Sequence, residues 1–168
     1  MTNLSQYHHA ATINPIQDSR VSAMYEAIKQ TDSHPLQDYQ TVFEQVVAWG
    51  DMDIFQHLNN VRYYEYAQSA RIDHLTRLNL FKEGIFTIIV STSCQYRRSV
   101  VFPDTLWIGV RTKHVGNTSL THEYCFFSTA QQAVVATGES VVVQMTADGK
   151  KHPFSEEQKQ RIHTFKAS

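Results

Sequence analysis

One long helix-forming segment followed by four strand-forming segments constrains the fold more than any other feature of this sequence. Residues 59–81 have the length and residue types of a helix, and small Ala67 and Ala70 lie on its apolar side. From residue 85 the apolar period changes to two, which predicts strands over 85–100, 105–115, 119–130 and 133–145. Another strand over 39–49 precedes the helix. We therefore predict an α+β domain, in which a curved antiparallel sheet of about five strands wraps one buried helix and the last four strands form a meander.

Side-chain patterns predict which faces of these elements are buried. The predicted strand 105–115 has two different faces, because Leu106, Ile108 and Val110 alternate with Trp107, Gly109 and Arg111. Gly138 interrupts the last strand and indicates a bulge or a close backbone approach. The helix has a wide apolar surface, which predicts that it is largely buried. This surface comprises Tyr63, Ala67, Ala70 and His74, widened by Val61, Tyr64, Ile72, Leu75 and Leu78.

The chain divides into three parts. Residues 1–38 are predicted to be an N-terminal extension, with a short amphipathic helix over 16–30 that has Ile16, Val21, Met24 and Ile28 on its apolar side. Residues 39–150 form the main domain, and residues 151–168 form a helical tail whose helix is capped by Ser155.

Composition excludes several classes of protein. A formal net charge of −1 over 168 residues gives no support for nucleic-acid binding, and no apolar run is long enough to span a membrane. Two cysteines, Cys94 and Cys125, cannot make a disulfide framework, so we expect a cytoplasmic protein in which both thiols pack inside strands. No histidine or cysteine spacing is typical of a metal site, and we expect neither a metal nor a cofactor.

The segment W-G-D-M-D-I-F-Q-H-L-N-N (49–60) is the densest cluster of functional groups. It holds Asp51, Asp53, His57, Asn59 and Asn60 directly before the buried helix. Backbone N–H groups in the first turn of a helix are free to bind an oxygen that gains negative charge, and a nearby carboxylate can act as general base or nucleophile. The simpler interpretation is that these residues cap the helix and form turns, above all Asp51 and Asn59. The residues alone leave both interpretations open.

The same segment, extended through V-R-Y-Y-E-Y and followed by A-R at 70–71, resembles the hotdog-fold acyl-CoA thioesterases of the 4-hydroxybenzoyl-CoA thioesterase type. It is also similar to the D-x-D-x-x-x-H-V-N-N-x-x-Y stretch of plant acyl-ACP thioesterases. The resemblance covers about residues 39–150, including the predicted order of elements. It implies a hotdog fold, and an acyl-CoA or acyl-carrier protein as the substrate.

The resemblance also implies roles for individual residues. Asp53 matches the carboxylate that acts as nucleophile or general base, and His57 matches the histidine of the plant-type pattern. Asn60 matches the helix start whose backbone N–H polarises the thioester carbonyl. Two positions depart from the pattern: Phe55 stands where the plant-type enzymes have Asn, and Gln68 stands where some relatives have Glu. Relatives of a second hotdog type use a helix Glu as the base, and Glu65 is the nearest candidate here.

Further residues are expected to bind the substrate. The family resemblance places Arg97 and Arg98 near the phosphates of CoA or of the carrier, although an exposed strand end with solubilising charge explains them equally well. We also expect Asn59 and Tyr63 to bind substrate. Three tyrosines of the helix are expected to lie mostly in the core, with one of them able to close over an acyl group: Tyr63, Tyr64 and Tyr66.

The leading functional hypothesis is an acyl-CoA or acyl-carrier thioesterase that works as a homodimer or homotetramer. A hotdog enoyl-CoA hydratase or dehydratase is the second hypothesis, but its D-x-N-P-x-H pattern is absent and Asp53 lies four residues before His57 rather than five. A non-catalytic acyl-binding module is the third, because Phe55 leaves the polar set of the plant-type pattern incomplete.

Overall fold

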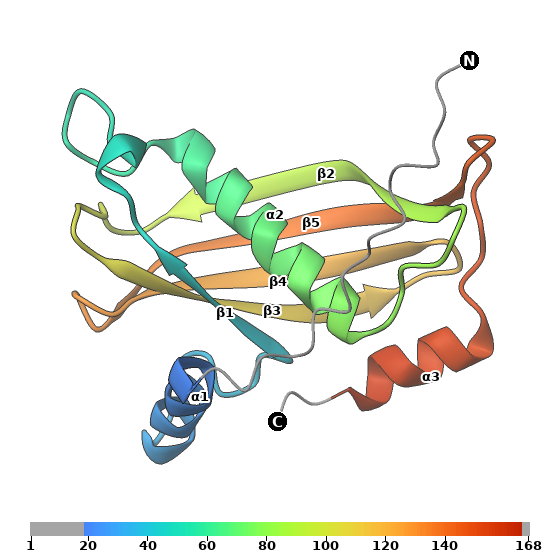
Figure 1. Ribbon diagram of the computed structural model, residues 1–168, viewed down its shortest axis with the longest axis horizontal. Coiled ribbons are helices and arrows are strands. Elements are labelled where there is room, and N and C mark those ends of the chain that lie inside the picture. The colour runs from blue at the N-terminus through green and yellow to red at the C-terminus, as the bar shows by residue number, and fades with distance from the viewer. Residues whose placement is uncertain (1–18, 166–168) are drawn as a thin grey trace.

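The computed structural model describes residues 19–165, with side chains from residue 22 onward. Three helices, one short 3-10 helix and five strands make up this part of the chain (Figure 1). In chain order they are α1 (Ser19–Gln30), β1 (Thr41–Val46), η2 (Trp49–Asp51), α2 (Asn60–Arg77), β2 (Ile85–Tyr96), β3 (Thr105–Val115), β4 (Ser119–Ser128), β5 (Ala133–Thr146) and α3 (Glu156–Thr164). The predicted α+β class, the five-stranded antiparallel sheet and the helix wrapped by it are confirmed.

The strands lie side by side in the order β1-β3-β4-β5-β2, and every neighbouring pair is antiparallel. Strands β3, β4 and β5 form the expected meander. The prediction that β2 belongs to it is wrong, because β2 pairs with β5 at the far edge of the sheet. Gly138 makes this pairing close, since a Cβ atom there would stand 2.6 Å from the Ser93 carbonyl oxygen. Of the two expectations for Gly138, the close backbone approach is confirmed.

Helix α2 runs across one face of the sheet and forms the main core with it (Figure 1). Ala67 and Ala70 are buried there, so the small side chains let the sheet approach as expected. The inward face of β3 is buried through Leu106, Ile108 and Val110. The predicted apolar stripe is too wide, however. Val61 and Ile72 are 55% and 44% exposed, because α2 contacts β1 and β3 and leaves the side of the helix that carries these two residues uncovered.

Helix α1 covers part of the opposite face of the sheet, where its Met24 and Ile28 pack with Trp107 and Phe127. The Tyr25 hydroxyl also accepts a hydrogen bond from the Val42 N–H at 3.0 Å, which satisfies a backbone donor of the edge strand β1. The predicted helix is confirmed over 19–30; Ile16 and the side chain of Val21 lie outside the described residues.

The predicted C-terminal helix is present as α3, which covers the carboxyl end of α2. Ser155 caps α3 by accepting from the Gln158 N–H at 3.2 Å, which confirms the expected cap. Ile162 packs with Leu75 and Leu78 in a separate cluster. The domain boundaries at 38 and 150 stay predictions.

Candidate active site

A tight loop between η2 and α2 carries Asp53. The Asp53 N–H donates to the His57 carbonyl at 2.8 Å, and the Gln56 N–H donates to the Asp53 carbonyl at 3.0 Å. Gln56 has φ of 61°, a left-handed conformation that closes the turn. The Leu58 N–H donates to the Val100 carbonyl at 2.8 Å, so the loop is fixed to the segment that joins β2 and β3.

The two oxygens of the Asp53 carboxylate have different surroundings. Oδ1 accepts hydrogen bonds from the Phe55 N–H at 2.8 Å and the His57 N–H at 3.3 Å, which braces the turn. Within residues 19–165, no hydrogen bond to Oδ2 is present. Asp53 therefore has a structural role through one oxygen and keeps the other available, and its side chain lines two neighbouring cavities.

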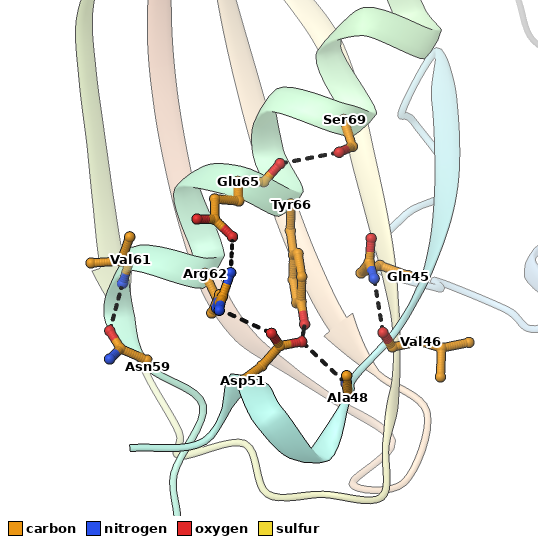
Figure 2. A network of polar contacts seen from close by, with 10 residues as sticks. All are labelled: Gln45, Val46, Ala48, Asp51, Asn59, Val61, Arg62, Glu65, Tyr66 and Ser69. Atoms are coloured by element: carbon orange, nitrogen blue, oxygen red, sulfur yellow. Dashed lines mark hydrogen bonds and ion pairs between the residues drawn. The ribbon is translucent and has the colours of Figure 1, made fainter. Parts of the chain in front are cut away.

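Asp51, the last residue of η2, fixes the start of the loop. Its carboxylate accepts hydrogen bonds from the Tyr66 hydroxyl and from the Ala48 N–H at 3.2 Å, and it forms an ion pair with Arg62 Nε at 3.1 Å, as Figure 2 shows. Burial, and then the Asp51 carboxylate, raise the pKa of Tyr66 above its ordinary value, so the phenol stays protonated and donates. Asp51 thus ties η2 to α2 through both of its oxygens.

The amino end of α2 points into the site. Asn59 is the N-cap, and its Oδ1 accepts from the Val61 N–H at 3.0 Å (Figure 2). The Arg62 N–H donates to the Asn59 carbonyl at 2.9 Å. Among the described residues, none accepts a hydrogen bond from the Asn60 N–H, so this first-turn donor remains for a ligand.

Two cavities meet at Asp53 and His57. The first, the polar cavity, has a volume of about 290 Å³ and is lined by Asp53, His57, Leu58, Asn60, Tyr63, Tyr96, Arg97, Arg98 and Ser99. The second has a volume of about 800 Å³ and is lined by Trp49, Gly50, Met52, Asp53, Phe55, Gln56, His57, Val101 and Phe102. We name it the apolar cavity after its Trp, Met, Phe and Val side chains, which the first cavity lacks.

Aromatic and basic side chains form the wall of the polar cavity opposite Asp53. The rings of Tyr63 and Tyr96 meet edge to face with their centroids 5.0 Å apart, and the Tyr96 hydroxyl donates to the Asn60 carbonyl at 3.3 Å. Burial raises the pKa of Tyr63 to about 12, so its hydroxyl is a neutral donor. Arg97 and Arg98 are exposed, and none of the described carboxylates forms an ion pair with either guanidinium.

The structure brings most of the residues expected at the site together. Asp53, His57, Asn60, Tyr63, Arg97 and Arg98 all line the polar cavity, and the capping residue Asn59 lines neither cavity. Glu65 also lies outside both, and its carboxylate pairs with Arg62. Sequence reasoning missed Ser99 and the aromatic wall of the apolar cavity. The sequence contains one indication of that wall, because Phe55 stands where the plant-type pattern has Asn.

Two further expectations concern a metal site and a membrane-spanning segment. No cluster of three or more His, Cys, Asp or Glu side chains in the described part of the chain is arranged to hold a metal ion, and the expected lack of a metal stays a prediction. None of the helices between residues 19 and 165 is both long and apolar enough to cross a membrane.

A five-stranded antiparallel sheet wrapped around one helix defines a hotdog fold, and here a carboxylate lies at the amino end of that helix. The family model of the thioesterase-like superfamily matches residues 47–162, so the chain belongs to this superfamily. The uncharacterized protein YsmA of Bacillus subtilis (strain 168) is 32% identical over 138 residues, which are 77% of this chain and 93% of YsmA.

Two further relatives carry names that describe an activity. The long-chain acyl-CoA thioesterase FadM of Escherichia coli (strain K12) is 32% identical over 72 residues, 40% of this chain and 54% of FadM. A thioesterase of Thermus thermophilus, solved in complex with coenzyme A and Zn, superposes with a TM-score of 0.68 at 26% identity. That superposition covers 76% of this chain and 95% of the other.

Proposed function

We propose that this protein is an acyl-CoA or acyl-carrier thioesterase in which Asp53 is the catalytic carboxylate. The observation that carries the proposal is the pairing, in one cavity, of a carboxylate oxygen and a helix-end N–H that both lack a partner among the described residues. Membership of the thioesterase-like superfamily supports it, as do the activities named for FadM and for the Thermus thermophilus protein.

The chemistry follows from what each group offers. The Asn60 N–H and the positive end of the α2 dipole stabilise negative charge on the thioester oxygen as the carbonyl carbon becomes tetrahedral. Asp53 provides for the nucleophilic attack that forms this tetrahedral carbon in one of two ways. Its carboxylate removes a proton from the attacking water, or it attacks the carbon itself to form an acyl-Asp53 anhydride that water hydrolyses. In both routes the thiolate leaves and the acyl group departs as a carboxylic acid.

His57 and the two arginines position the substrate in this scheme. His57 lies beside Asp53 on the wall shared by both cavities, where its imidazole hydrogen-bonds the substrate or the attacking water. Arg97 and Arg98 lack ion-pair partners among the described residues and are free to bind the phosphates of CoA or of a phosphopantetheine arm.

Replacement of Asp53 by Asn tests the proposal, because the amide oxygen can still accept from the Phe55 N–H and keep the turn braced. Hydrolysis is measured as thiol released from a panel of acyl-CoAs. We expect wild-type turnover and a loss of about 100-fold or more in kcat for Asp53→Asn, the usual contribution of a general base or nucleophile. An unchanged thermal midpoint shows that the loss is chemical.

The bracing role of Asp53 also fits a non-catalytic acyl-binding module, and the same assay separates the two. Tight binding of acyl-CoA by the wild-type protein without any release of thiol would establish the module. Equal turnover by wild type and Asp53→Asn would also refute the catalytic role. Hydration of an enoyl-CoA, followed as a loss of absorbance, would instead indicate the hydratase activity.

We also propose that the protein is a homodimer formed through β2. This twelve-residue strand pairs only with β5 among the described residues, so its outer edge has free backbone donors and acceptors. Phe86, Ile88, Ile89 and Val90 are all at least 40% exposed on it. A long apolar edge of this kind aggregates unless another strand covers it, and a second copy of β2 matches it in length.

Light scattering during size-exclusion chromatography tests the dimer. We expect twice the mass of one chain for the wild type and a monomer for Ile88→Lys, because a charge on the apolar edge opposes pairing. Lys82→Glu is the matched control, since Lys82 is exposed just before β2 and lies outside the strand. A monomeric wild-type protein would refute the proposal.

A further inference from the structure

Asp53 and His57 line both cavities, which differ in the other side chains that form them. On one side are hydroxyl, amide and guanidinium groups, including Arg97 and Arg98. On the other side are the apolar side chains of Trp49, Met52, Phe55, Val101 and Phe102, together with Gly50 and Gln56. A molecule with a reacting centre in the middle, a polar, anionic part on one side and an apolar part on the other would match these two sets of side chains.

The apolar cavity is built from two segments that lie far apart in the sequence. Residues 49–57 supply one side and residues 101–102 supply the other, and the hydrogen bond from the Leu58 N–H to the Val100 carbonyl holds them together. Trp49 and Phe55 are 77% and 73% exposed, and Val101 and Phe102 are about half exposed. Exposed aromatic side chains grouped around a hollow next to a reactive carboxylate are typical of a ligand-binding surface.

We propose that the apolar cavity binds the acyl group of the substrate as an extended aliphatic chain, and that Trp49, Phe55 and Phe102 determine chain-length specificity. This inference rests on the proposed thioesterase function. At roughly 30 Å³ for a group the size of a water molecule, the seven carbons of a benzoyl group fill about a quarter of the 800 Å³ cavity. A chain of about eight to sixteen carbons fills a third to more than half of it and covers more of the apolar wall.

This placement gives the substrate one direction across the site. The thioester carbonyl lies at the shared wall, next to Asp53 and the Asn60 N–H, and the acyl chain extends from its carbon over Phe55. The sulfur and the phosphate-bearing arm extend the other way, toward Arg97 and Arg98. Phe55, the residue that departs from the plant-type pattern, thereby has a role in binding the acyl chain rather than in acid–base chemistry.

Binding of thioether analogues tests the inference independently of hydrolysis. Ethyl-, octyl-, dodecyl- and benzyl-CoA thioethers have no carbonyl to cleave, and calorimetry gives their Kd. We expect affinity to rise about fourfold for each added methylene buried, up to the length that fills the cavity. Benzyl-CoA should bind more weakly than octyl-CoA. Phe55→Ala and Phe102→Ala should each reduce the ratio of dodecyl- to ethyl-CoA affinity by about tenfold or more.

Ile54→Ala is the matched control. Ile54 precedes Phe55, is 89% exposed and lines neither cavity, so this variant should keep the wild-type ratio. Equal binding of ethyl- and dodecyl-CoA by the wild type would overturn the inference, and tighter binding of benzyl-CoA would show an aromatic acyl group instead. If Phe55→Ala dissociates the dimer and keeps the chain-length ratio, a second copy covers this cavity and the inference is overturned. Chain-length-dependent binding without any thiol release would retain the acyl cavity and refute the thioesterase function.

Discussion

Asp51 and Asp53 are the same residue type two positions apart, yet the fold uses them in opposite ways. Asp51 accepts hydrogen bonds from Tyr66 and Ala48 and forms an ion pair with Arg62, so both of its oxygens are engaged. Asp53 braces its turn through one oxygen and faces two cavities. A carboxylate is available for chemistry when its neighbours bond to only one of its two oxygens. For Asp51, a residue more than ten positions away in the sequence engages the second oxygen; for Asp53, no described residue does.

The largest expected effect comes from moving the Asp53 carboxylate while keeping its charge. In Asp53→Glu the extra methylene displaces the oxygens by about 1 Å or more, a shift that can cost about 100-fold in rate. We expect kcat for thiol release to fall by that factor while the thermal midpoint falls by a few degrees. A Glu variant with wild-type kcat would show that Asp53 only supplies negative charge to the loop.

Asp51→Ala should have the converse effect. The substitution leaves the hydroxyl of the buried Tyr66 without its acceptor, which costs about 1–3 kcal/mol, whereas the exposed Ala48 N–H can bond to water. We expect chemical denaturation to show a loss of about 1–3 kcal/mol in the free energy of unfolding. Turnover per folded molecule should stay within about threefold of wild type. A 100-fold loss of kcat in the folded variant would place Asp51 in the chemistry as well.

More of the fold than of the site could be predicted from the sequence. The period of the strands and the length of the helix depend on local sequence, so the elements were expected nearly where they lie. The edge position of β2 depends on which strand its backbone meets, and Gly138 in β5 gave only an indirect sign of that contact. The exposure of Val61 and Ile72 has the same cause, because an apolar pattern does not show how far the sheet extends beneath the helix.

At the site, the sequence placed the functional groups on one loop but did not distinguish their roles. Nothing local shows that Tyr66, fifteen residues after Asp51, engages that carboxylate. Likewise, the apolar cavity needs Phe102 beside Phe55, and this depends on a hydrogen bond between two loops. Arg97 and Arg98 were predicted on family resemblance, and their lack of ion-pair partners among the described residues is a structural finding.

Arg97→Ala and Arg98→Ala test whether the two arginines in the cavity beside Asp53 bind the phosphates of the substrate. Each should raise KM for acyl-CoA about tenfold with little change in kcat, because an exposed charge-assisted contact to phosphate contributes to binding throughout the reaction. A truncated acyl-N-acetylcysteamine thioester, which has no phosphate, is the control and should be hydrolysed equally by wild type and variants. Equal losses on both substrates would mean that the arginines shape the cavity instead.

Asn59→Ala should have the smallest effect. The loss of the cap on α2 is expected to reduce the free energy of unfolding by about 1 kcal/mol, and the position of the Asn60 N–H should change little. Thermal denaturation measures the loss. Asn59→Asp, which keeps an acceptor for the Val61 N–H, is the matched control and should stay close to wild type. A loss of activity in both variants would give Asn59 the substrate-binding role predicted from the sequence.

The most direct measurement compares kcat for thiol release between Asp53→Asn and Asp51→Asn, each assayed well below its melting temperature with saturating acyl-CoA. Both substitutions remove one negative charge and keep an acceptor oxygen in the same loop. We predict that Asp53→Asn retains about 1% of the wild-type kcat or less and that Asp51→Asn retains about a third or more. Equal kcat values for the two folded variants would contradict the assignment of the chemistry to the oxygen of Asp53 that the fold leaves free.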